Sequence, residues 1–232
     1  MARLPRLAVA GQAHLVTLAG HSGQAVFIDD VDRQCFLDAL RETALQQHAA
    51  VHAYVLATDH VHLLVTPPSA GAVGTLGALM QGLGRRYVAA FNRRHGRSGS
   101  LWAGRFRATV VQAGAPLLEA LLFIDHHAVR AGQVSSADAA RHSSAPHHLG
   151  LRRDPLLSAA AAYWQLGNTP FEREAAYRRL LDDGLAAPRA RALGEASRKG
   201  WAWGDAAFLA ELGQQLQRPL QPRPRGRPVS RA

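Results

Sequence analysis

Two histidines separated by a single residue lie in the segment T-D-H-V-H-L-L-V-T, residues 58 to 66. Side chains of a β-strand alternate between two faces, so His60 and His62 would share one face with Leu64. Neighbouring imidazoles of this kind can bind a divalent metal ion. Histidines on a strand also occur as ordinary hydrogen-bonded polar residues. The spacing alone therefore leaves both interpretations open.

A long segment without acidic residues follows the histidine pair. The chain has a formal net charge of +10, and residues 60 to 118 contain no Asp or Glu. The arginines that could contact phosphate in this segment are Arg85, Arg86, Arg93, Arg94, Arg97, Arg105 and Arg107. An ordinary solvated surface intersperses both signs of charge, so we predict a surface that binds nucleic acid. Aromatic residues between these arginines, such as Trp102, could stack on bases or belong to the core.

The C-terminal tail, residues 218 to 232, is rich in Arg and Pro, contains no acidic residue and is predicted to be disordered. Its segment P-R-G-R-P places Arg225 and Arg227 on either side of a glycine. This pattern resembles motifs in which arginines follow the minor groove of A·T-rich DNA. We favour the alternative of non-specific phosphate contact by the same arginines.

Hydrophobic periodicity and turn residues indicate the elements that position the candidate residues. Strands are predicted at residues 14–19, 51–57, 60–66 and 101–111, and the turn at 58–59 would join the second and third strands into an antiparallel hairpin. Helices are predicted at residues 29–48, 73–94 and 116–132. Asp29 or Asp30 could cap the first helix, and Phe36, Leu40 and Leu45 would face the core.

The order β-α-β-β-α-β predicts an α+β fold of the ferredoxin-like type. In this fold, two helices cover one face of an antiparallel sheet, and the other face can serve a ligand. Residues 133–155 read as an irregular connection, and 156–215 contain several helical patterns. We therefore divide the chain into a domain at residues 1–135, a helical extension at 136–217 and the tail at 218–232.

Composition predicts an intracellular protein without a membrane span. No apolar stretch approaches the roughly 18 residues of a spanning helix, and the start of the chain has no apolar core of signal-peptide length. The single cysteine, Cys35, cannot form an internal disulfide and suits a reducing cytosol.

Several segments together resemble the REP-associated tyrosine transposases, relatives of the single-tyrosine HUH transposases of bacterial insertion sequences. The segments are H-A-Y-V-L-A-T-D-H-V-H-L-L-V-T-P, M-Q-G-L-G-R-R-Y-V-A-A-F-N-R-R-H-G-R-S-G-S-L-W-A-G-R-F-R-A, A-V-R-A-G and Y-W-Q-L-G-N-T-P-F-E-R. The resemblance covers most of residues 1 to 180 and implies an HUH transposase domain in a cytoplasmic bacterial protein. The implied partner is single-stranded or hairpin DNA, such as a repeated palindromic element, and the family is compatible with a homodimer.

The resemblance also implies a reaction. In such enzymes the histidine pair, together with a polar residue one helical turn after a tyrosine, holds a divalent cation, usually Mg²⁺ or Mn²⁺. The cation polarises a scissile phosphate. The tyrosine attacks it, forming a 5′-phosphotyrosine link and freeing a 3′-hydroxyl for later strand transfer.

The helix that would carry this tyrosine departs from the family pattern Tyr-Ile-x-x-Asn-Pro-Val-Arg-Ala-Gly, because the chain reads F-I-D-H-H-A-V-R-A-G. On the register of V-R-A-G, Phe123 takes the place of the nucleophile and His127 that of the third ligand. Three imidazoles would favour zinc, nickel or manganese over magnesium. The alternative is that His127 is no ligand. Asp125 would point away from this face, exposed to solvent or paired with an arginine.

Phenylalanine has no hydroxyl with which to attack phosphorus, so the sequence leaves two functions open. One is a DNA-cleaving transposase that uses another residue, for which Tyr87 in R-R-Y-V-A-A-F is the substitute, although packing in the core is its simpler role. The other is a catalytically inactive or domesticated relative that binds DNA hairpins. An RNA-binding or metal-binding module unrelated to transposition would require all the matching segments to be accidental.

Overall fold

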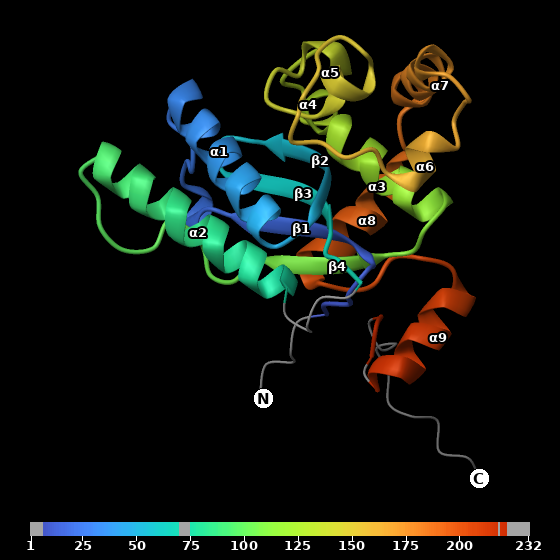
Figure 1. The fold of residues 1–232 in the computed structure, drawn as a ribbon, viewed down its shortest axis with the longest axis horizontal. Coiled ribbons are helices and arrows are strands. Elements are labelled where there is room, and N and C mark those ends of the chain that lie inside the picture. The colour runs from blue at the N-terminus through green and yellow to red at the C-terminus, as the bar shows by residue number, and fades with distance from the viewer. Residues whose placement is uncertain (1–6, 70–74, 218, 222–232) are drawn as a thin grey trace.

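A four-stranded antiparallel sheet of order β2-β3-β1-β4 lies at the centre of the fold (Figure 1). The structure is a computed structural model that describes residues 7–69, 75–217 and 219–221. The strands are β1 (Ala13–Ala19), β2 (Ala50–Leu56), β3 (His60–Thr66) and β4 (Arg107–Val111). The α+β ferredoxin-like prediction is confirmed. The fourth strand is shorter than predicted, because it begins only at Arg107.

Two helices, α1 (Asp30–Gln46) and α2 (Thr75–Arg94), cover one face of the sheet (Figure 1). The Asp29 carboxylate caps α1 by accepting hydrogen bonds from the Val31 and Asp32 amides, as predicted. Phe36 and Leu40 are fully buried, but the inward prediction for Leu45 is wrong, because its side chain is 71% exposed. Five residues along a helix correspond to a rotation of about 500°, which turns Leu45 about 140° away from Leu40.

The second face of the sheet is also covered, although the sequence predicted helices on one face only. Here α3 (Ala115–Asp125) and α8 (Ala187–Lys199) pack on apolar residues of the strands. Leu15, Leu64 and Val55 belong to this second core together with Leu193 of α8. The residues assigned to a helical extension therefore share a core with the sheet. The division of the chain at residue 135 stays a prediction.

Further helices, some of only a single turn, connect and follow these layers. They are η1 (His21–Gly23), α4 (His127–Arg130), η2 (Ala137–Ala139), α5 (Ala145–His148), α6 (Ala161–Trp164), α7 (Pro170–Asp183) and α9 (Ala206–Leu216). The helix predicted at 116–132 is interrupted at His126, where α3 ends and α4 begins. Among the described residues, no helix has the length and apolarity needed to cross a membrane. Most of the predicted tail, including Arg225 and Arg227, lies outside the described residues.

A buried polar cluster centred on Asp125 ties α3 to the C-terminal helices. The Asp125 carboxylate is fully buried and accepts hydrogen bonds from His148 Nδ1 at 2.6 Å, from the Tyr177 hydroxyl at 2.8 Å and from the Ser144 hydroxyl. The prediction that Asp125 is exposed or paired with an arginine is therefore wrong. It does point away from the sheet histidines, but the segment after Gly132 folds back over it and supplies the donors.

Candidate functional site

Three histidines from two elements converge on the second face of the sheet. The alternation of β3 places His60 and His62 on this face, and His127 is the first residue of α4. The Nε2 atoms of His60 and His127 are 2.9 Å apart, and one ring nitrogen of each of the three histidines lies within 4.8 Å of the others. The sequence register that paired His127 with the two strand histidines agrees with this geometry.

The outer nitrogens of the two strand histidines have partners that orient the rings. His60 Nδ1 donates to the Asp59 carboxylate at 2.7 Å. His62 Nδ1 lies 2.9 Å from the Thr17 hydroxyl, which in turn lies 2.5 Å from the Ser197 hydroxyl of α8. With the Nδ1 atoms engaged, the Nε2 atoms of both strand histidines are available to a metal ion. Such outer partners are usual around metal-binding histidines.

This histidine triad, defined as His60, His62 and His127, has the donor set of a metal site. Two nitrogens that bind one ion at about 2.0–2.1 Å lie about 2.8–3.4 Å apart at bond angles of 90–110°. The 2.9 Å separation of two Nε2 atoms lies within this range. His127 Nδ1 is buried and has no hydrogen-bond partner among the described residues. The triad therefore fits a divalent cation, and its geometry does not select one metal.

The electrostatic environment keeps two of these rings neutral. Burial, reinforced by the neighbouring histidines, lowers the pKa of His62 well below its usual value. Burial and the nearby His60 lower the pKa of His127 to about 4. Neutral imidazole is the form that binds metal ions, so neither ring has to lose a proton at neutral pH before it can act as a ligand.

A cavity of about 820 Å³ opens in front of the triad. Phe123 of α3 lines it, and its ring centroid lies 5.4 Å from that of His62. The Arg130 guanidinium is stacked over the Phe123 ring, with its carbon 4.2 Å from the ring centroid, and donates to the Phe123 carbonyl at 3.0 Å. The opposite wall belongs to α8 and includes Arg191, Gly194 and Arg198.

All four tyrosines of the chain are engaged elsewhere. The Tyr54 hydroxyl donates to Asp154 at 2.6 Å, and the Tyr87 hydroxyl donates to the Val26 carbonyl. The Tyr163 hydroxyl donates to the His148 carbonyl at 2.7 Å, and the Tyr177 hydroxyl donates to Asp125 at 2.8 Å. All four side chains are buried, and none lines the cavity among the residues described there. Burial raises the pKa of each, that of Tyr163 to about 12.

The structure contradicts Tyr87 as the substitute nucleophile. Its ring packs among Phe27, Phe36 and Trp102 in the core under α1 and α2. That core contacts the opposite face of β3 from the histidines. The sheet therefore separates the Tyr87 hydroxyl from the triad. Its simpler predicted role, packing against the sheet, agrees with this position.

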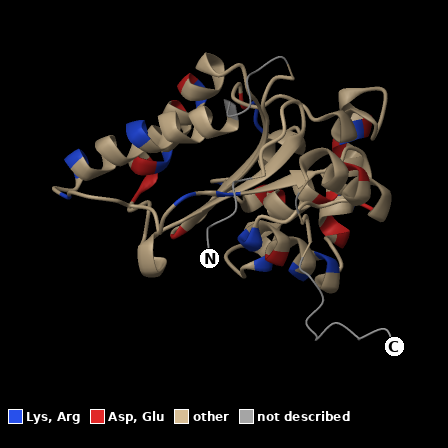
Figure 2. Ribbon diagram, turned by 90° about the horizontal axis from the view of Figure 1, so that it is seen from below, with Lys and Arg blue, Asp and Glu red and all other residues tan. Residues whose placement is uncertain are grey.

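The arginines predicted to bind DNA do not form a single face. Arg85, Arg86, Arg93 and Arg94 belong to α2, on the far side of the sheet from the triad, whereas Arg97 and Arg105 are exposed between α2 and β4. Arg107 begins β4 and is the cross-strand neighbour of Thr17, which pairs with His62, so its side chain lies on the histidine face. Figure 2 shows Lys and Arg on helices on both sides of the sheet, with acidic residues among them.

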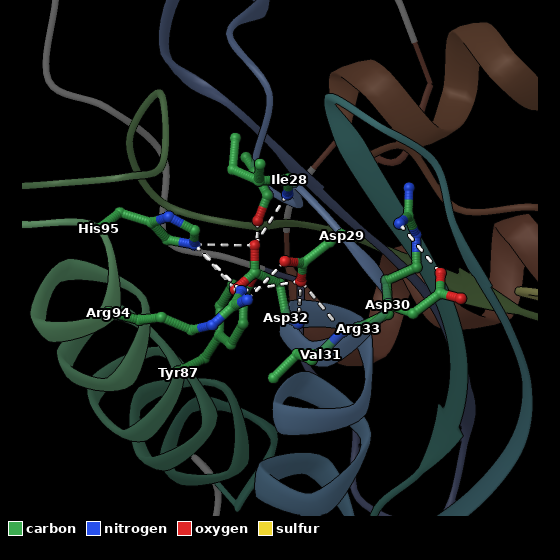
Figure 3. Close-up of polar contacts among 10 residues, drawn as sticks. Ile28, Asp29, Asp30, Val31, Asp32, Arg33, Tyr87, Arg94 and His95 are labelled. Atoms are coloured by element: carbon green, nitrogen blue, oxygen red, sulfur yellow. Dashed lines mark hydrogen bonds and ion pairs between the residues drawn. The ribbon is translucent and has the colours of Figure 1, made fainter.

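Two of the α2 arginines are held by carboxylates of α1. Arg94 contacts Asp29 and, at 2.5 Å, the buried Asp32, which His95 also approaches at 3.0 Å (Figure 3). The Arg94 guanidinium lowers the pKa of Asp29 to about 2. Arg86 donates to Glu42 at 2.6 Å. The aromatic residues between the arginines, Phe91, Trp102 and Phe106, are buried and belong to the core.

Sequence reasoning did not identify several residues of the site. Thr17 and Ser197 orient a ligand, and Arg191 and Arg198 reach the cavity from α8. Local pattern gave no signal for them, because their role depends on where α8 packs. Arg130 belonged to the V-R-A-G segment that fixed the register and could have been named from it.

The family comparison agrees with this geometry. The family model described as "Transposase IS200 like" matches residues 9–122, which include all four strands and both sheet histidines. The chain belongs to the IS200-like transposase family. The resemblance predicted from sequence is thereby confirmed. A search of curated proteins found no match.

Two solved structures of transposases are similar to this chain. One is a REP-associated tyrosine transposase bound to a REP hairpin, with a TM-score of 0.54, 15% sequence identity and coverage of 70% of this chain and 93% of that chain. Another is described as a candidate transposase from Deinococcus radiodurans R1, with a TM-score of 0.37, 24% identity and coverage of 48% of this chain and 88% of that chain. The first likeness supports the fold of this transposase family member.

Proposed function

We propose that this family member binds single-stranded or hairpin DNA at the cavity in front of the histidine triad and forms no phosphotyrosine link. The observation that carries the proposal is the position of the four tyrosines. Each is buried and hydrogen-bonded away from the cavity, and Phe123 lies beside His62 where the family register places the nucleophile. The protein then acts as a catalytically inactive relative in DNA transposition rather than as a strand-transferring enzyme.

The histidine triad supports the binding half of the proposal. His60, His62 and His127 would hold a divalent cation, and a bound cation would supply a Lewis acid that neutralises charge on a phosphate oxygen. Asp59 and Thr17 orient the two strand histidines for this task. Mg²⁺ or Mn²⁺ follows from the family resemblance, whereas an all-imidazole donor set favours Zn²⁺ or Ni²⁺.

The class of DNA is inferred from the likeness and from charge. The similar REP-associated transposase was solved with a REP hairpin, and the chain described above is strongly basic, with a net charge of +10. The exposed arginines predicted from sequence, among them Arg85, Arg93 and Arg107, would add phosphate contacts around the molecule. A cytoplasmic location in a bacterium and a homodimer are further parts of this proposal.

The experiment compares two gels with the same labelled DNA, a hairpin that carries a single-stranded flank. In the native gel the unmodified protein should shift the hairpin, and the shift should weaken steeply with salt as counterions compete for phosphates. In the denaturing gel no covalent band should appear with Mg²⁺ or Mn²⁺. A covalent band would refute the non-catalytic assignment, and its loss in Tyr87→Phe would show that Tyr87 becomes accessible.

A further inference from the structure

We propose that α8 carries a phosphate-binding site that faces the histidine triad, in which Arg191 and Arg198 act with Arg130 on the backbone of a single DNA strand. The inference rests on the proposed function and names the residues that hold the strand at the cavity. These arginines lie outside the acid-free segment from which DNA contacts were predicted, and two of them come from the C-terminal part of the chain.

Arg130 is the first observation. Its side chain is exposed at the cavity wall, where it stacks on Phe123, and its one hydrogen bond within the described residues goes to the Phe123 carbonyl. No carboxylate pairs with it among those residues. A guanidinium that lines a cavity without a counter-charge can donate charge-assisted hydrogen bonds to a phosphate that enters it.

The spacing on α8 is the second observation. Arg191 and Arg198 are seven residues apart, close to two helical turns, so both project from one side of the helix about 10.5 Å apart along its axis. Both line the cavity, and Gly194 lies between them. An added Cβ at Gly194 would lie 3.7 Å from the Phe123 ring, an ordinary van der Waals contact, so α8 passes close to Phe123 at this point.

The acidic residues of the cavity are already engaged. Asp59 accepts from His60, and Glu195 pairs with Lys199 on α8. None of the three cavity arginines forms a direct ion pair within the described residues, although the charge of Arg198 also acts on Glu195. The cavity therefore presents an excess of positive charge to an entering strand, with three arginines against two carboxylates among its lining residues.

The backbone of α8 is fixed to the sheet at the level of the triad. The Thr109 hydroxyl of β4 donates to the Ala196 carbonyl at 3.1 Å, and the buried Ser197 hydroxyl lies 2.5 Å from that of Thr17. The same helix thus holds Thr17, which contacts His62, and presents Arg191 and Arg198 to the cavity. The α2 arginines cannot serve this role, because the sheet lies between them and the triad.

The test measures binding of two fluorescent DNAs, a hairpin with a single-stranded flank and the same hairpin without it, over a series of salt concentrations. The variant is Arg191→Gln/Arg198→Gln. Both positions are exposed, and glutamine has a high helix propensity, so α8 should stay folded. The matched control is Arg178→Gln/Arg179→Gln on α7, which removes the same charge from a helix outside the cavity. A third protein, Arg191→Lys/Arg198→Lys, keeps the charge.

The α8 glutamine variant should bind the flanked hairpin roughly tenfold more weakly than the control does. Its plot of log affinity against log salt should lose about 1.4 of slope, at about 0.7 for each single-strand phosphate contact. The lysine variant keeps both positive charges and should therefore show the salt slope of the unmodified protein. A merely structural role of the arginines would not explain a slope that follows the charge. The hairpin without a flank should bind all three variants alike.

Equal binding of the flanked hairpin by the α8 variant and the α7 control would overturn the site, while DNA binding by the protein would stand. An equal loss on both hairpins would also overturn it, because the arginines would then act on the stem. Failure of the unmodified protein to bind either DNA would instead contradict the proposed function itself.

Discussion

His14 should make the stability of this protein sensitive to mild acid. The side chain is fully buried in β1, where its Nε2 accepts a hydrogen bond from the Val9 amide at 3.1 Å. Its Nδ1 has no partner among the described residues. Burial lowers the pKa of His14 from 6.5 to about 4. Acid must therefore force a charge into the core or unfold the chain.

The sign and size follow from linkage. Between pH 6.5 and about 4 the unfolded chain binds a proton at His14 that the folded chain does not, so the free energy of unfolding falls as the pH falls through this window. In the unfolded chain His14 has a pKa of 6.5, which lies about 1.5 units above pH 5, so it is protonated at that pH. In the folded chain its pKa is about 4, so it remains mostly neutral. At about 1.36 kcal/mol per pH unit, His14 alone should lower the free energy of unfolding by about 2 kcal/mol between pH 7 and pH 5.

The assay is urea unfolding of the unmodified protein and of His14→Gln at pH 7 and pH 5. Gln can accept the Val9 hydrogen bond but cannot titrate, so the variant should lose about 2 kcal/mol less than the unmodified protein on acidification. His21→Gln, at the exposed first residue of η1, is the control and should keep the full loss. Identical losses in the protein and in His14→Gln would refute the reasoning, whatever the variant's stability at pH 7.

The remaining predictions concern the cavity and the buried cluster around Asp125. Phe123→Tyr should give a covalent DNA adduct with Mn²⁺ in denaturing gels, although a misplacement of about 1 Å would slow it roughly a hundredfold; no adduct at any time would show that more than the hydroxyl was lost. Asp59→Asn should weaken Zn²⁺ or Mn²⁺ binding in calorimetry by about 10–100-fold, whereas the exposed Asp38→Asn should not. Asp125→Asn should lower the free energy of unfolding by about 3 kcal/mol in urea, and Tyr177→Phe by only about 1; equal small losses would contradict a structural role for the carboxylate.

The strand histidines could be placed from sequence because a strand alternates strictly. A spacing of two residues on a strand fixes a common face, and the V-R-A-G register placed His127 one helical turn after Phe123. The register survives the break at His126, because the amide of His126 still bonds to Leu122 at 2.9 Å and that of Arg130 to His126 at 2.9 Å. Strand periodicity therefore predicted the sheet and the histidine pair, whereas the family resemblance supplied His127.

The residues that escaped prediction depend on contacts across long stretches of sequence. Asp125 is buried by donors 19 to 52 residues further along the chain, so its local pattern resembled that of an exposed acid. Ser197 reaches Thr17 across 180 residues. The α2 arginines formed a strong local signal, but a charge count cannot tell which face of the sheet a helix will cover. Tertiary packing decided these positions.

The arrangement of the site explains how cleavage chemistry and DNA binding could separate. The triad depends on β3, on the start of α4 and on the hydrogen bonds that Asp59 and Thr17 share with the two strand histidines, none of which involves the side chain of Phe123. A phenylalanine ring fills the same volume as a tyrosine ring, so the absence of one hydroxyl removes the nucleophile without opening a cavity or moving a ligand. The stacked Arg130 keeps its ring and carbonyl contacts in either case. Because the metal-binding histidines and the nucleophile position are different residues, one substitution is enough to remove the nucleophile while the cavity in front of the triad stays intact.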